Sequence, residues 1–175
     1  VREGLITVED VQVIRYTHRY LNPLPADKPI QDVMTDEVVT LGPEMTVAQA
    51  WELMLERSIK AMPVVDQNRR VLGMLTDEDL IHRAGLQQHL SVAARLDQDL
   101  LDEQLDLLRT STLKVADVMT RPAITAHIGE FLGPAAARMA KYEIKRLPVV
   151  DDAGRLLGVV ARVDGLRQVM DLEAK

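Results

Sequence analysis

Two stretches of the chain place apolar and polar residues in the same order. In the first, the apolar runs 62–65 and 71–75 are too short for helices and indicate buried strands. The polar residues 66–69 between them favour a turn, so the two strands are predicted to form a hairpin. The second stretch repeats the pattern, with strands predicted at 147–150 and 156–160.

A helix is predicted ahead of each hairpin. Thr46, followed three residues later by Gln49, is a capping-box pattern, which predicts a helix running to about Arg57. The second copy lacks this cap, and Gly133-Pro134 marks the helix start instead, because proline is tolerated in the first turn.

Further short elements complete each unit. Strands are predicted at 38–41 and 123–126, before the helices, and a last helix follows each hairpin, near 78–83 and 164–170. Each unit is therefore β-α-β-β-α, and the fold class is α/β (α+β).

The two units correspond residue by residue. Met34 returns as Met119 and Pro63 returns as Pro148, a shift of 85 positions in both cases with no insertion between the copies. Two copies of one unit usually pack with pseudo-twofold symmetry, which creates a pair of related clefts. We expect the function to lie in those clefts.

Segments outside the repeats have their own patterns. Residues 1–22 are rich in β-formers, and closely spaced prolines follow. Leucines between Leu96 and Leu108 fall mostly at helical spacings among acidic residues, which indicates an amphipathic helix. This helix either caps its own module or forms a dimer interface. The predicted organisation is a strand segment at 1–22, a linker at 23–29, repeat one at 30–86, a helical connector at 87–112 and repeat two at 113–171.

Composition excludes several functional classes. The net charge of −6 among 175 residues disfavours DNA or RNA as a partner, since nucleic-acid binding needs a clustered basic face. No apolar run is long enough for membrane insertion, and the chain has no cysteine and no secretory signal pattern, so we expect a cytoplasmic protein. The 4 histidines have no metal-ligand spacing, and no catalytic constellation is present. We therefore expect neither a metal site nor an enzyme.

Four motifs in order carry a family resemblance. Asp32-Val33-Met34-Thr35, then Thr46-Val47, then Met62-Pro63-Val64-Val65-Asp66, then Gly73 to Asp79 resemble a cystathionine-β-synthase (CBS) domain, and the second copy repeats the set from Asp117 to Gly158. The resemblance implies a tandem CBS pair, or Bateman module, which binds adenosine-containing ligands between its repeats and dimerises into a disk. Residues 3–16 resemble the last strand of a small PII-like domain, which would imply a longer parent chain with a preceding domain.

The resemblance assigns the main cleft to residues of both repeats. Asp79 would accept both ribose hydroxyl protons, and Thr76 would donate toward the phosphate. Lys145 and Arg146 would bind the phosphate as cations. The remaining residues predicted to flank the adenosine are Met74, Thr120, Ile124, Thr125 and Ile144.

The second cleft departs from this pattern. Ala161 stands where Thr76 stands in the first copy, and Ala61 stands where Arg146 stands in the second. One hydroxyl and one cation are therefore missing, so we predict a weak or empty site. Its predicted residues are Asp164, Thr35, Val39, Ile59 and Lys60.

Two functions remain open at this point. The first is a non-catalytic regulatory module that senses an adenosine-containing ligand, AMP, ADP, ATP or S-adenosylmethionine, without any required cofactor. The alternative is a homodimerisation and interaction module whose clefts are degenerate and hold no ligand. The residues at the main cleft favour the first, and the depleted second cleft favours the alternative.

Overall fold

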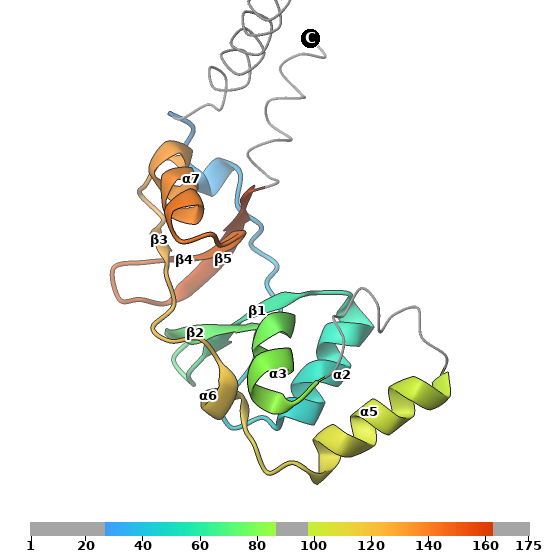
Figure 1. Ribbon diagram of the computed structural model, residues 1–175. Helices are drawn as coiled ribbons and strands as arrows, with labels where there is room; N and C mark the ends of the chain where they lie inside the picture. The colour runs from blue at the N-terminus through green and yellow to red at the C-terminus, as the bar shows by residue number, and fades with distance from the viewer. Residues whose placement is uncertain (1–26, 87–97, 163–175) are drawn as a thin grey trace, which may run out of the picture. The chain divides into compact units, whose positions relative to one another are not determined.

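The computed structural model describes residues 27–86 and 98–162 (Figure 1). The strand expected within 1–22, the first part of the connector and the helix expected at 164–170 lie outside the described residues. The elements in chain order are η1 (Ile30–Asp32), α2 (Val47–Arg57), β1 (Ala61–Val65), β2 (Val71–Thr76), α3 (Asp77–Ala84), α5 (Gln98–Thr110), α6 (Val115–Val118), β3 (Ala126–His127), α7 (Leu132–Lys141), β4 (Arg146–Val150) and β5 (Leu156–Ala161).

The chain folds into two compact units that do not follow the order of the repeats. The larger unit consists of the described residues within 35–127 and 148–159, and the smaller one of the described residues within 1–34, 128–147 and 160–175. Residues of both repeats therefore enter each unit.

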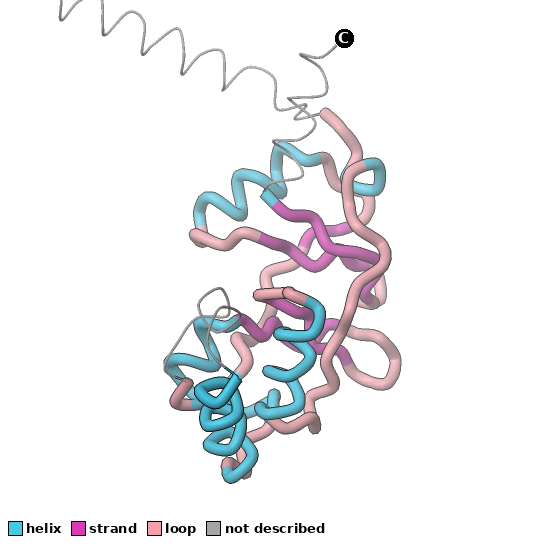
Figure 2. The backbone as a smooth tube through the Cα atoms, turned by 90° about the vertical axis from the view of Figure 1, so that its right-hand side faces the viewer, coloured by secondary structure: helices cyan, strands magenta, loops and turns pink. Residues whose placement is uncertain are grey.

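The two predicted hairpins are confirmed. In the larger unit β1 pairs with β2 in antiparallel register, from Ala61 opposite Thr76 to Val65 opposite Val71. The second sheet has the strand order β3-β4-β5, and β3 runs parallel to β4. Figure 2 shows these strands together with the helices and loops that connect them.

The strand predicted at 38–41 is wrong in its extent. Only Leu41 pairs, in a parallel bridge with Val64, donating its N–H to the Pro63 carbonyl at 3.0 Å. Proline has no N–H to donate to the carbonyl of Val39, so the ladder cannot extend toward the N-terminus. Pro148 is the corresponding residue in the second copy, where β3 starts only at Ala126 rather than at the predicted 123.

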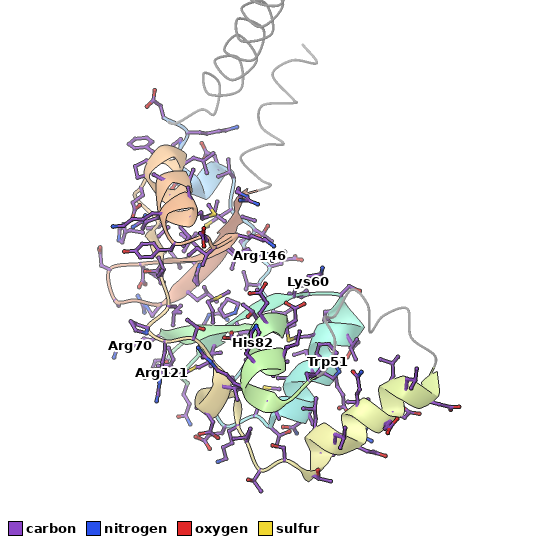
Figure 3. All side chains as sticks on the ribbon, in the orientation of Figure 1. Trp51, Lys60, Arg70, His82, Arg121 and Arg146 are labelled. Atoms are coloured by element: carbon purple, nitrogen blue, oxygen red, sulfur yellow. The ribbon has the colours of Figure 1, made fainter. Side chains whose placement is uncertain are left out.

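Helix α2 begins and ends as the sequence predicts. The Thr46 side chain accepts from the Gln49 N–H at 3.2 Å, and the Gln49 side chain accepts from the Thr46 N–H at 3.1 Å. These two bonds satisfy N–H groups that a helix start otherwise leaves unpaired. Trp51 of this helix, labelled in Figure 3, is fully buried in the core of the larger unit. Residues of α2, both strands of the first hairpin, α3 and α6 build that core.

Helix α7, in the smaller unit, begins one residue earlier than predicted. Its N-cap is Phe131, which provides no side-chain hydrogen bond, and Pro134 occupies the first turn as expected. Glu130, just before the helix, forms a salt bridge with Arg138, which lies within the helix. The fully buried Ala135 and Met139 form the inner face of the helix.

Hydrogen bonds between the repeats occur in couples related by the shift of 85. The Val71 N–H donates to the Gly154 carbonyl at 3.1 Å, and the Leu156 N–H donates to the Arg69 carbonyl at 2.8 Å. The two bonds join equivalent residues, because Val71 corresponds to Leu156 and Arg69 corresponds to Gly154 under the shift of 85.

The same exchange relates the opening segments of the two copies. Thr35 exchanges two backbone hydrogen bonds with Val159, and Thr120 exchanges two with Met74. The N–H of Ile30 donates to Glu130, and the N–H of Val115 donates to Met45. The predicted pseudo-twofold relation of the repeats is therefore present in the backbone bonding itself.

The connector helix α5 packs on its own unit. Leu108 is buried, and Leu101 and Leu105 pack against the same core as α2. The Arg109 guanidinium donates to Glu52 of α2 at 2.7 Å. The interpretation that this helix caps its own module is thus correct for one of its faces.

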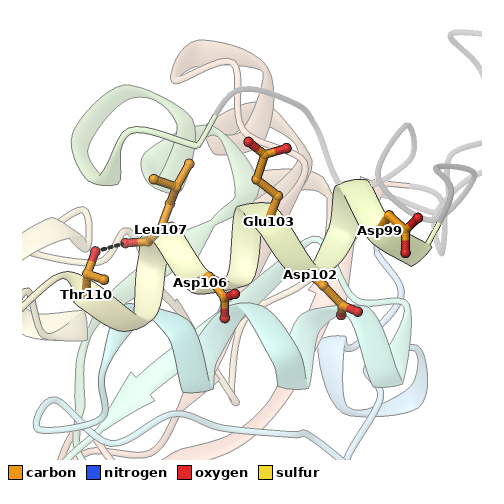
Figure 4. A pocket seen from close by; sticks show the side chains of 6 residues that line it. All are labelled: Asp99, Asp102, Glu103, Asp106, Leu107 and Thr110. Carbon is orange, nitrogen blue, oxygen red and sulfur yellow. Dashed lines mark hydrogen bonds between the residues drawn. The ribbon is translucent and has the colours of Figure 1, made fainter.

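The other face of α5 carries acidic side chains and two exposed leucines. Figure 4 shows the carboxylates along a shallow depression that is lined by Asp99, Asp102, Glu103, Asp106, Leu107 and Thr110. Leu100 and Leu107 are 49% and 57% exposed. In the part of the chain that the structure describes, no helix has the length and apolar character needed to cross a membrane.

Candidate functional site around Asp79

The junction of β2 and α3 concentrates polar groups at one point. Thr76 ends the strand and caps the helix, since its hydroxyl accepts from the Asp79 N–H at 3.1 Å. The Asp79 carboxylate accepts in return from the Thr76 N–H and hydroxyl, both at 2.9 Å. The helix start therefore fixes the position of a carboxylate beside its own N-terminal amides.

Asp79 also contacts the second repeat. The Thr120 hydroxyl donates to its other carboxylate oxygen, Oδ1, at 2.9 Å. Asp79 is only 7% exposed, whereas Thr120 is exposed to solvent. A buried carboxylate of repeat one is thus held by a surface hydroxyl of repeat two.

Arg83 ties the same two segments together from one turn further along α3. Its Nη1 lies 3.5 Å from Asp79 Oδ1 and donates to the carbonyls of Val118 and Met119 at 2.9 and 3.0 Å. Those carbonyls end the short helix α6, where a cation is favourable. Arg83 therefore sets the distance between α3 and the segment that leads to Thr120.

A glycine permits this close approach. A Cβ on Gly73 would lie 2.7 Å from the Thr120 carbonyl oxygen and 2.8 Å from the Met119 sulfur. Met74, the next residue, forms both backbone hydrogen bonds with Thr120. Gly73 of the CBS-like motif is thus required because the backbone of the second repeat leaves no room for a Cβ.

The structure brings together part of the residues predicted for the main cleft. Thr76, Asp79, Met74 and Thr120 form one bonded cluster in the larger unit. Ile124 and Thr125 belong to the same unit and are partly buried. Residues 144–146 belong to the smaller unit, where Lys145 is exposed and accepts at its carbonyl from the Arg162 N–H at 2.9 Å. The contacts of residues 144–146 with a ligand remain predictions.

Four of the residues predicted for the second cleft are described. Thr35 is exposed and bonded through its backbone to Val159, as Thr120 is to Met74. Lys60 accepts at its carbonyl from the Asp77 N–H at 3.1 Å, and its exposed side chain is labelled in Figure 3. Val39 and Ile59 pack against the core of the larger unit. Asp164 lies outside the described residues.

Sequence reasoning missed Arg83. Its position four residues after Asp79 places it on the same helix face, which is the available signal. Its bonds to the carbonyls of residues 118 and 119, however, join positions 35 and 36 apart in sequence, and no local pattern predicts them. Within residues 27–86 and 98–162, no group of three or more histidine and carboxylate side chains is arranged to hold a metal ion.

The family of this chain follows from a comparison with protein-family models. The family model of the CBS domain matches residues 30–85 and 115–171, which are the two repeats. The chain belongs to the CBS-domain family. The match covers both halves of the Asp79 cluster, Thr76 to Arg83 in the first domain and Val118 to Thr120 in the second.

Curated relatives contain the CBS pair in different settings. The CBS domain-containing protein YhcV of Bacillus subtilis is 31% identical over 77% of this chain and 81% of its own length. L-aspartate semialdehyde sulfurtransferase of Methanocaldococcus jannaschii is 26% identical, but the match spans only 22% of that enzyme. The part shared with the enzyme is therefore the CBS region, a minor share of its length.

Solved CBS pairs have the same fold. CBSX2 in complex with AMP is 26% identical, covers 83% of this chain and 98% of its own, and has a TM-score of 0.63. The CBS domain pair of MJ0100, in complex with 5′-methylthioadenosine and S-adenosyl-L-methionine, is 25% identical, covers 80% of this chain and 98% of its own, and has a TM-score of 0.59.

Proposed function

We propose that this CBS pair is a non-catalytic regulatory module that binds an adenosine-containing ligand, with Asp79 as the residue that recognises the ribose. The observation that carries the proposal is the Asp79 carboxylate, fixed at the start of α3 and bonded to Thr120 of the other repeat. A ligand that engages this carboxylate acts where the two repeats meet. The AMP and S-adenosyl-L-methionine complexes of similar CBS pairs support this class of ligand.

The chemistry of the cluster suits a ribose. An ionised carboxylate offers about four acceptor positions and can bind the two hydroxyl groups of a sugar at once. The amides at the N-terminus of α3 favour a nearby anion, and Arg146 would supply a fork-shaped cation for a phosphate. No residue of the cluster is needed as a nucleophile, so binding without turnover is the expected behaviour.

Regulation would follow from a difference in affinity between two arrangements of the repeats. A ligand shifts such an equilibrium only as far as it binds one arrangement better. We also propose that the module works as a homodimer, with the exposed leucines of α5 available for contact, and that the parent chain carries a preceding domain that reads the change.

Isothermal titration tests the proposal. We expect AMP, ADP, ATP or S-adenosylmethionine to bind the wild-type chain without being consumed, and Asp79→Ala to abolish binding while the far-ultraviolet circular dichroism spectrum is retained. Glu78→Ala is the matched control, because Glu78 is an exposed carboxylate on the same helix turn. A folded wild-type chain that binds none of the four would leave the interaction module as the better function.

A further inference from the structure

Donors of the protein itself already occupy most acceptor positions of the Asp79 carboxylate. The carboxylate accepts from the Thr76 N–H, the Thr76 hydroxyl and the Thr120 hydroxyl, and Arg83 Nη1 lies 3.5 Å from its Oδ1. A carboxylate has about four acceptor positions and these bonds take three of them, so too few are left for the two hydroxyl groups of a ribose. A ribose with two hydroxyl donors can bind Asp79 only if a protein donor leaves.

Thr120 is the donor that can leave. The two bonds from Thr76 belong to the cap of α3, and breaking them would open the helix start. The Thr120 hydroxyl comes from a separate segment, on an exposed residue, so its side chain can rotate into water. It also donates to Oδ1, whereas both bonds from Thr76 go to Oδ2.

The backbone around Thr120 holds without this hydroxyl. Two backbone hydrogen bonds with Met74, at 3.0 and 2.9 Å, fix residue 120. The Arg83 guanidinium fixes the carbonyls of residues 118 and 119. Removing the Thr120 hydroxyl therefore frees an acceptor position on Asp79 while residues 118–120 stay in place.

We infer that the Thr120 hydroxyl is an internal competitor of the ribose for Asp79, and that it sets the affinity and the sugar selectivity of the site. The inference rests on the proposed function, because it concerns how the same carboxylate receives its ligand. In the ligand-free chain the hydroxyl stabilises the buried carboxylate; in the complex a ribose hydroxyl takes its place. A ligand that lacks ribose hydroxyls has no reason to displace it.

Titration of Thr120→Val with AMP and with 2′,3′-dideoxy-AMP tests the inference. Valine keeps the β-branched shape and loses the donor, so we expect AMP to bind Thr120→Val about tenfold to a hundredfold more tightly than wild type, the range of one hydrogen bond to a charged group. Affinity for 2′,3′-dideoxy-AMP should not change. Thr120→Ser keeps the hydroxyl, so its ratio of AMP affinity to 2′,3′-dideoxy-AMP affinity should stay closer to that of wild type than the ratio of Thr120→Val does.

Thr110→Val is the matched control, since it removes an exposed threonine hydroxyl of α5 that bonds to the Leu107 carbonyl. If Thr120→Val does not fold, the comparison of Thr120→Ala with Thr120→Ser replaces it, with tighter AMP binding expected for alanine. Unchanged or weaker AMP binding by Thr120→Val, with normal binding by wild type, overturns the inference and leaves the proposed function standing. If wild type and every variant bind none of AMP, ADP, ATP and S-adenosylmethionine, both the inference and the proposed function are overturned.

Discussion

At the scale of single residues, Gly73 has no room for a side chain. A Cβ there would lie 2.7 Å from the Thr120 carbonyl oxygen, a backbone atom that the Met74 bridge holds in place. We expect Gly73→Ala to destabilise the fold by about 1–3 kcal/mol, the usual cost of overpacking. Urea unfolding followed by the fluorescence of Trp51, the single tryptophan, measures it.

Gly42→Ala is the control for this substitution. The nearest atom to a Cβ at Gly42 is the Met45 Cγ at 3.9 Å, which is ordinary contact. Equal losses of stability in the two variants would mean that the close approach of Thr120 to Gly73 is not what requires the glycine.

Arg146 carries a second prediction at this scale. As a phosphate ligand its removal should weaken AMP about tenfold to a hundredfold and adenosine much less, because the lost charge-assisted bonds go to the phosphate alone. Titrations of Arg146→Ala with AMP and adenosine measure the two losses, and Arg57→Ala, on the exposed end of α2, is the control. Equal losses for both ligands would contradict a phosphate role.

The residues that sequence reasoning identified and those it missed differ in the range of their contacts. Thr76 and Asp79 were identified from a motif of the CBS resemblance, and the helix cap that they form is a local pattern of residues three apart. That Asp79 is bonded to Thr120 depends on a contact across 41 positions, and Arg83 was found only from the folded chain. Local chemistry is readable in one sequence, whereas the partner of a buried polar group is set by packing.

At the scale of elements, the turn of the second hairpin contains a pH-sensitive carboxylate. The Arg155 N–H donates to Asp151 at 2.9 Å, and with the Arg155 side chain and the Ala153 N–H it lowers the pKa of Asp151 below its ordinary 3.8. Since the folded pKa is the lower one, ionised Asp151 stabilises the fold above the unfolded value. That contribution is lost as the pH falls through the folded pKa.

Asp151→Asn should therefore be less stable than wild type near neutral pH, and the difference should shrink below the ordinary carboxyl pKa of 3.8. Thermal unfolding of both proteins across this range measures the difference, with Asp99→Asn on the exposed face of α5 as the control. A difference that stays constant with pH would show that the turn depends on the shape of the side chain and not on its charge.

Element boundaries were predictable where one segment determines them. The capping box of Thr46 and Gln49 placed the start of α2, and the polar turns placed both hairpins. The strand at 38–41 failed because its pairing depends on Pro63, a residue of another strand that has no N–H to donate. The apolar composition of a segment does not show whether the neighbouring strand has the N–H groups that a β-ladder needs.

At the scale of the whole molecule, the two copies differ in what they offer a ligand. Ala161 and Ala61 remove a hydroxyl and a cation from the second cleft, so we expect one AMP bound per chain. Asp164→Ala should change neither stoichiometry nor affinity by more than about twofold, whereas Asp79→Ala should abolish binding. Titration of the two variants decides the ranking, and two equal sites in wild type would refute it.

The couples of backbone bonds between the copies have a consequence for how such a chain can be assembled. Residues 28–35, at the end of the linker and the start of repeat one, bond to residues 130–132 and 159 of repeat two, and residues 113–120 bond back to residues 43–47 and 74 of repeat one. A solitary copy would have no partner for its own opening segment. It could bond that segment to protein groups only by exchanging it with a second molecule, so the tandem chain is the covalent counterpart of a segment-exchanged dimer. Joining the copies replaces an association that depends on protein concentration with an intramolecular one, equivalent to a partner at roughly millimolar concentration.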